Sequence, residues 1–168
     1  SLHAALPTSL KTIQQLNDPH SIAGLQSKIA DLYVKQGRWD EALALYEASL
    51  NTKKQLNDPR EIAMTQNSYG QALIVSQRDM GLGVEMVWLG YLGIERFKNP
   101  REIQIGHKLL NDIKQHLGAQ FDEIWARRIG IPQPEWLTNA AEPSQEEQFA
   151  QLIRQLKGIY DQRGAEAV

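Results

Sequence analysis

Apolar residues recur every three or four positions along most of the chain, which is the spacing of a buried helix face. The first such stripe is formed by Ile22, Leu25, Ile29, Leu32 and Tyr33. Gly37 follows this stripe and can end a helix, because glycine readily adopts the left-handed conformation found at helix C-termini. A second stripe, in residues 39–56, comes directly afterwards. The pattern predicts two antiparallel helices joined by a tight turn.

One short segment occurs three times and marks a helix start. Residues 15–23 are nearly repeated 40 residues later as residues 55–63, and a shortened copy follows 41 residues after that, at 97–103. Each copy places a short polar side chain directly before proline. That side chain can cap the helix by accepting a hydrogen bond from a free backbone N–H, and proline suits the first helical position because the missing N–H costs nothing there. The capping residues are Asp18, Asp58 and Asn99.

Glu61 and Glu102 stand three residues after their caps, the spacing of a capping box, in which the glutamate bonds back to the capping residue. Together the stripes and caps predict helix starts near Pro19, Trp39, Pro59, Met80 and Pro100. A period of 40 to 41 residues is typical of a stacked helical repeat, in which each helical pair buries its apolar face on its neighbours.

We therefore expect an all-α protein, built as a right-handed superhelical array of antiparallel helical hairpins with a C-terminal capping helix. The array is assigned to residues 1–130, with a partial first unit and further units starting near residues 19, 59 and 100. Because residues before Asn17 resemble the end of a second helix, we expect the chain to belong to a longer protein or assembly. Residues 131–168 are assigned to a linker and the amphipathic capping helix, whose apolar stripe is Phe149, Leu152, Ile153, Leu156, Ile159 and Tyr160.

Two apolar segments admit a second interpretation. Residues 86–94 are apolar on all sides, which favours a central buried helix but also suits a partner surface. The C-terminal stripe either caps the open end of the array or docks on another chain and makes a homo-oligomer.

Composition and charge restrict the function. The net charge of −2 argues against a nucleic-acid partner, since such proteins usually carry a basic face. The absence of cysteine excludes disulfides and thiolate metal sites, and fits a reducing, cytoplasmic location. The uncharged run at 86–94 is far shorter than the roughly 20 residues that span a bilayer.

No motif predicts catalysis, a cofactor or a metal. Gly81 and Gly83 resemble part of a dinucleotide-binding loop, but Met86 stands at the third glycine position and no strand precedes them. We interpret Gly83, Gly90 and Gly93 as positions of close helix packing. The histidines show no pairing at a metal-ligand spacing, and neither a nucleophile elbow nor a phosphate-binding loop is present. We expect a protein that is not an enzyme.

Residues 29–50 carry a family resemblance. The pattern has an apolar–small pair, an aromatic residue three positions later, glycine before the turn, and then aromatic and small residues at fixed spacing. It is supplied by Ile29, Ala30, Tyr33, Gly37, Trp39, Ala42, Tyr46 and Ser49. This segment resembles a tetratricopeptide repeat, and the 40-residue period resembles the long variety of kinesin light chains and many bacterial arrays. The resemblance is weaker in the second unit and weakest in the third.

The resemblance implies a non-catalytic module that binds a protein, as a peptide or helix, on the concave face lined by first helices. Carried over position by position, that face contains Ser27, Lys28, Asp31, Lys35, Asn67, Ser68, Gln71, Ile74, Lys108, Asp112 and Gln115. The asparagine and lysine set with which some family members grip a terminal carboxylate is not reproduced, since Asp31 and Gln71 replace asparagine. A solvated polar face remains the plain alternative for these residues. The rival function is a structural scaffold that oligomerises through its central or C-terminal helix.

Overall fold

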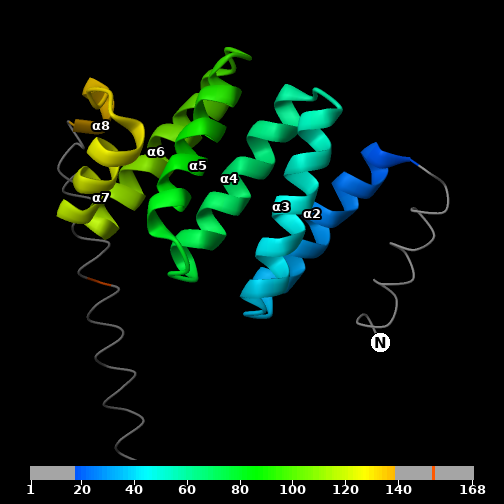
Figure 1. Ribbon diagram of the computed structural model, residues 1–168. Coiled ribbons are helices and arrows are strands. Elements are labelled where there is room, and N and C mark those ends of the chain that lie inside the picture. The colour runs from blue at the N-terminus through cyan, green and yellow to red at the C-terminus, as the bar shows by residue number, and fades with distance from the viewer. Residues whose placement is uncertain (1–17, 139–152, 154–168) are drawn as a thin grey trace, which may run out of the picture. The chain divides into compact units, whose positions relative to one another are not determined.

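The computed structural model describes residues 18–138 and residue 153, and every regular element in this part of the chain is helical (Figure 1). The long helices are α2 (Pro19–Lys35), α3 (Trp39–Gln55), α4 (Pro59–Val75), α5 (Met80–Glu95) and α6 (Pro100–Leu117). They are followed by the shorter elements α7 (Ala119–Ile124), the π-helical turn η1 (Trp125–Ile129) and α8 (Glu135–Thr138). All five predicted helix starts are confirmed. The partial first unit and the capping helix lie outside the described residues, apart from residue 153.

The chain divides into two compact units, Ser1–Gln133 and Pro134–Val168. In the first unit each long helix packs against the helix that follows it, so the chain forms successive helical hairpins. We call α2, α4 and α6 the first helices and α3, α5 and the α7–η1 segment the second helices. The described part of the second unit holds the single turn α8. None of the described helices is both long and apolar enough to cross a membrane.

The predicted caps form at all three proline starts. Asp18 accepts a hydrogen bond from the backbone N–H of His20, and Asp58 accepts one from Glu61. Asn99 accepts from the two residues after Pro100. The two glutamates of the predicted capping boxes form ion pairs: Glu61 pairs with Lys53, and Glu102 pairs with Arg60. Each glutamate therefore ties its first helix to another part of the array.

Glycines bring α4 and α5 into very close contact. A Cβ atom at Gly70 would lie 2.6 Å from the carbonyl oxygen of Gly83, and one at Gly90 would lie 2.7 Å from the carbonyl oxygen of Ala63. Gly93 has a similar contact with the side chain of Ala63. The predicted role of these glycines in helix packing is confirmed, and the face of α5 that carries Gly83, Val87 and Gly90 is buried.

Aromatic rings fill the interface between α5 and the third unit. Trp88 stacks on Tyr91 at a ring separation of 5.4 Å and meets Trp125 edge-on at 4.8 Å. Phe121, which is fully buried, stacks on Trp125. The π-helical turn begins at Trp125, whose indole N–H donates to the carbonyl of Ile131. The second helix of the third unit thus packs on α5 through large aromatic side chains.

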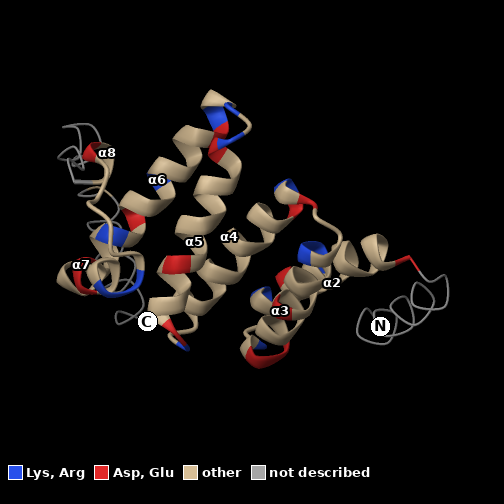
Figure 2. Ribbon diagram, turned by 45° about the horizontal axis from the view of Figure 1, so that its top comes forward, with Lys and Arg blue, Asp and Glu red and all other residues tan. Residues whose placement is uncertain are grey.

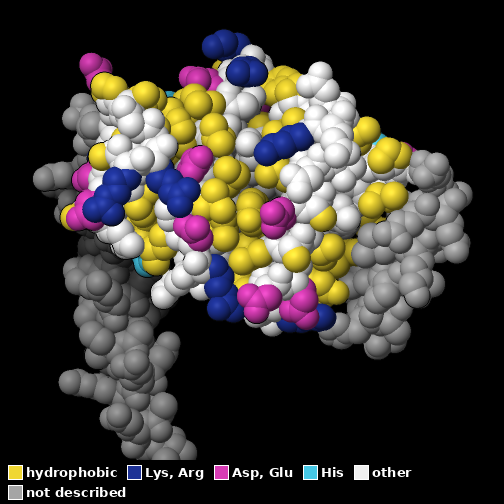
Figure 3. Space-filling model, viewed as in Figure 1, with side chains coloured by type: hydrophobic (Ala, Val, Ile, Leu, Met, Phe, Trp, Pro, Cys, Tyr) yellow, Lys and Arg dark blue, Asp and Glu magenta, His cyan; other side chains and the backbone are white. Residues whose placement is uncertain are grey.

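Charged side chains are distributed unevenly among the helices. Figure 2 shows that α4 is uncharged beyond its first turn, where Arg60 and Glu61 lie. On the face drawn in Figure 3, side chains of both signs are interspersed among apolar ones. No large region of a single charge forms on that face.

We predict that Gly70→Ala lowers the free energy of unfolding by about 1–3 kcal/mol or more, because the new methyl group meets backbone atoms of α5 that cannot move aside. Gly24→Ala in α2 is the matched control, since nothing lies within 4 Å of a Cβ there. This control should gain about 0.5–1 kcal/mol from the better helix propensity of alanine. Denaturant unfolding measures both. Equal effects of the same sign would contradict the assigned packing.

Candidate functional site

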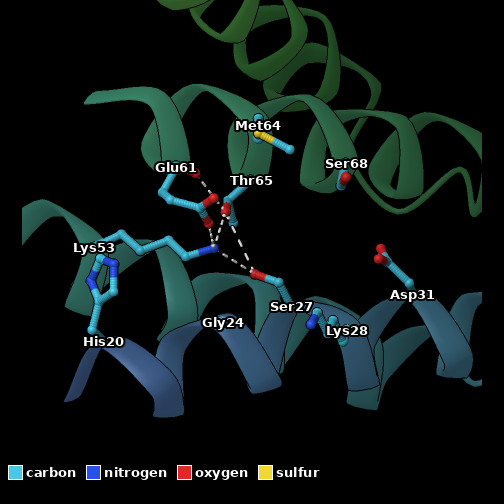
Figure 4. Close-up of a pocket in the computed structure, with 10 residues that line it drawn as sticks. All are labelled: His20, Gly24, Ser27, Lys28, Asp31, Lys53, Glu61, Met64, Thr65 and Ser68. Carbon is cyan, nitrogen blue, oxygen red and sulfur yellow. Dashed lines mark hydrogen bonds and ion pairs between the residues drawn. The ribbon is translucent and has the colours of Figure 1, made fainter. Parts of the chain in front are cut away.

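Pockets lie between successive first helices of the first unit. The first pocket, of about 410 Å³, lies between α2 and α4 and is floored by one residue of α3. Its lining residues are His20, Gly24, Ser27, Lys28, Asp31, Lys53, Glu61, Met64, Thr65 and Ser68 (Figure 4). A smaller pocket of about 240 Å³ adjoins it, shares Asp31 and Ser68, and reaches Gln71.

A buried lysine holds the floor of the first pocket together. Lys53 is only 3% exposed, and its ammonium group lies 3.0 Å from Ser27 Oγ, 2.8 Å from Thr65 Oγ1 and 2.9 Å from a carboxylate oxygen of Glu61. Figure 4 shows these groups converging from three helices. An ammonium group has three N–H donors, and here all three have a partner. Lys53 therefore joins α2, α3 and α4 and keeps no donor for a ligand.

The polar network extends below Lys53. Ser27 Oγ lies 2.7 Å from Ser49 Oγ, and Ser49 donates in turn to the carbonyl oxygen of Ala23. Thr65 donates to the carbonyl oxygen of Glu61. Each buried hydroxyl thus has a partner, which keeps the desolvation cost of the network low.

The second pocket, of about 180 Å³, lies between α4 and α6. Its lining residues are Arg60, Met64, Asn67, Tyr91, Ile94, Glu102, Ile105, Gly106 and Leu109. Its walls are largely apolar. Gly106 is required at its floor, because a Cβ at that position would lie 2.6 Å from the ring of Tyr91.

The two pockets are the same site of the repeat, occurring twice. Most residues that line one pocket have a counterpart in the other at a distance of 40 or 41 residues. The pairs are His20 and Arg60, Gly24 and Met64, Ser27 and Asn67, Lys53 and Ile94, Glu61 and Glu102, Met64 and Ile105, Thr65 and Gly106, and Ser68 and Leu109. The chemistry differs, however. Lysine, threonine and serine in the first pocket become isoleucine, glycine and leucine in the second.

The predicted binding residues separate into three groups. Ser27, Lys28, Asp31 and Ser68 come together in the first pocket, and Gln71 lies in the adjoining one. Asn67 lies in the second pocket. Lys35, Lys108, Asp112 and Gln115 are exposed on the first helices and line none of these three pockets. Within this exposed group, Lys108 and Asp112 neutralise each other at 3.0 Å.

Ile74 is buried rather than exposed on the face of the first helices. It is 7% exposed, and its side chain fills the space beside Gly83, where a Cβ would lie 2.6 Å from it. The assignment of Ile74 to the exposed wall is wrong because the last turn of α4 points this position toward α5.

Two tyrosines that line the pockets have a raised pKa. Burial raises the pKa of Tyr46, and the hydrogen bond that it donates to Asp31 raises it further. Burial, with the nearby Glu95 carboxylate, raises the pKa of Tyr91 to about 12. Burial also lowers the pKa of His107, whose Nε2 lies 3.0 Å from the Tyr91 hydroxyl. Both tyrosines are therefore neutral at pH 7, and Tyr46 holds the pocket residue Asp31 by donating to its carboxylate.

The sequence analysis missed Lys53, Met64 and Ile105. Lys53 lies in a second helix, outside the positions carried over from the family. A signal was available, since Lys53 continues the buried stripe of α3 and isoleucine occupies its place one repeat earlier and one repeat later, as Ile13 and Ile94. In residues 18–138, no three side chains of the metal-binding types are grouped as metal ligands.

Comparison with known proteins bears on one repeat. Residues 27–60 match the family model of the tetratricopeptide repeat. This match supports a repeat of that family over the second half of α2, all of α3 and the first two residues of α4, which include Ser27, Lys28, Asp31 and Lys53 of the first pocket. No curated protein and no solved structure matches the chain. Tetratricopeptide repeats generally mediate contacts between proteins.

We predict that Lys53→Ala lowers the free energy of unfolding by about 3 kcal/mol, because it leaves buried hydroxyl groups and a carboxylate without their cation. Lys53→Met should cost less than Lys53→Ala, because it loses the same polar contacts but an apolar chain of similar length fills the space and leaves no cavity. The neighbouring exposed Lys54→Ala serves as the control and should be close to neutral. A larger loss for Lys53→Met than for Lys53→Ala in thermal unfolding would refute this interpretation.

Proposed function

We propose that this chain is a non-catalytic protein-interaction module that binds a peptide along its first helices. The observation that carries the proposal is the recurrence of one pocket between successive first helices, in a chain that contains a tetratricopeptide match. A row of equivalent pockets suits a ligand that is itself a chain, because each pocket can take one part of it.

The proposal includes the wider architecture. The hairpins continue as a right-handed superhelix with the first helices on its concave face, in the manner of the long-period repeats of kinesin light chains. Residues 131–168 supply a linker and a capping helix for the open end. The chain acts without a cofactor, within the cytoplasm, as part of a longer protein or assembly.

Polar side chains in and beside the first pocket support hydrogen bonds to a peptide. Lys28 and Asp31 are exposed at its wall, and Ser68 lines both this pocket and the smaller pocket that adjoins it. Asn67 and Gln71 follow on α4, and amide side chains can pair with a peptide backbone without reading its sequence. Lys28 adds an attraction for acidic side chains that salt would weaken.

Oligomerisation remains the rival function, but α5 gives it little support. The large apolar residues buried within the unit include Val84, Val87, Trp88 and Tyr91 of α5. Little of the apolar surface of α5 therefore remains for contact with a second chain. That leaves the C-terminal stripe, of which only Ile153 is among the described residues. Sizing the purified chain across a range of concentrations separates the two functions.

The test uses a random peptide library to select binders of the immobilised chain. We expect Asn67→Ala and Lys28→Ala each to weaken a selected peptide by about fivefold, the value of one lost hydrogen bond or exposed charge contact. Glu47→Ala, an exposed change on α3, is the control and should bind like the parent. Helicity and thermal stability of all three are measured alongside. If both first-helix variants bind like the parent, this face is not the binding surface.

A further inference from the structure

We infer that the second pocket is a specificity subsite for one bulky apolar side chain, of the leucine, methionine or phenylalanine type, from an extended peptide. This inference rests on the proposed function and specifies its ligand. The module would then select peptides that carry an apolar residue at the position bound by the second pocket. The first pocket offers polar side chains at the equivalent positions of the repeat.

The walls and size of the second pocket favour a single apolar side chain. Met64 and Ile105 are 49% and 59% exposed, although both are large apolar residues on otherwise polar helix faces. Ile94 and Leu109 continue the apolar lining. The volume of about 180 Å³ is below the roughly 300 Å³ of the smaller pockets that bind whole small molecules. The pocket is therefore suited to one side chain that would cover Met64 and Ile105.

The charges at the mouth of this pocket are already paired. Arg60 donates to Glu102, so the only two charged residues in the lining neutralise each other. Arg60 also lies over the ring of Phe97, 5.1 Å from its centre. A charged ligand side chain would gain no free partner here and would lose its hydration. A neutral apolar side chain complements these walls better.

Two shielded oxygen atoms favour an extended backbone over a helix. Within the described part of the chain, Asn67 Oδ1 and Glu102 Oε2 are buried and accept no hydrogen bond. Asn67 lies on α4 and Glu102 on α6, and both residues line the second pocket. An extended peptide presents N–H groups along its backbone, whereas a helix has used most of its own, so small rotations of the two side chains would give both oxygens donors.

The experiment compares Ile105→Glu with Ile131→Glu in binding to the peptides selected from the library. Both residues are exposed, at 59% and 50%, but Ile131 lies outside the lining of the second pocket. We expect the selected peptides to share an apolar residue at one position. Ile105→Glu should weaken them by at least about tenfold, the effect of losing one buried apolar contact, and Ile131→Glu should leave binding unchanged.

A double-mutant cycle locates the contact. Replacing the shared apolar residue of the peptide by alanine should cause a loss similar to that of Ile105→Glu, and the two losses should not add. Leu109→Ser, which introduces the residue found in the first pocket, should reduce the preference for apolar over polar residues at that peptide position. Thermal unfolding of each variant shows that the losses do not come from misfolding.

The outcomes separate the two proposals. Peptides that depend on Lys28 and Asn67 but carry no shared apolar residue, with Ile105→Glu binding like the parent, would overturn the subsite and leave the proposed function standing. Peptides indifferent to all three residues, or a library without binders, would count against both. If the chain self-associates and Ile105→Glu makes it monomeric, a second copy occupies the pocket and the peptide subsite is wrong.

Discussion

The capped start of each first helix is the constraint on which the site depends. An aspartate or asparagine side chain accepts a backbone N–H in the first turn, and the proline that follows fixes the helix at its first residue. These starts are 40 and 41 residues apart, so equivalent side chains of α2, α4 and α6 recur at the same height along their helices. The pocket between α2 and α4 is repeated between α4 and α6 for this reason.

Each interface between helices is completed by different chemistry. The interface of α2, α3 and α4 has the ammonium group of Lys53 at its centre, surrounded by hydroxyl groups and a carboxylate. The interface of α4 and α5 depends on backbone contact through Gly70 and Gly90. The interface between α5 and the α7–η1 segment is formed by the aromatic rings of Trp88, Phe121 and Trp125. The repeat therefore conserves spacing rather than side-chain type, and this freedom allows one pocket to be polar and its counterpart apolar.

The sequence predicts the helices more fully than it predicts the binding surface. Proline after a capping residue identifies a helix start by local chemistry alone, which is why Pro19, Pro59 and Pro100 were located correctly. Helical periodicity shows which side of a helix is polar, but it does not show how deeply the next helix covers the edge of that side. Ile74 was misplaced for this reason, because α5 covers it. Lys53 was missed because its burial depends on partners from two other helices, and only the isoleucines at its equivalent positions reveal that burial in the sequence.

The central claim is that a peptide lies across the first helices and occupies both pockets. The most direct measurement is the change in backbone amide NMR signals of the isotope-labelled chain when a selected peptide is added. The account predicts that the largest changes fall on α2, α4 and α6, with those around Met64, Asn67 and Ile105 among them, while the exposed side of α3 near Glu47 stays unchanged. Changes confined to α3, to the exposed part of α5 around Leu89, or to the C-terminal segment would contradict it.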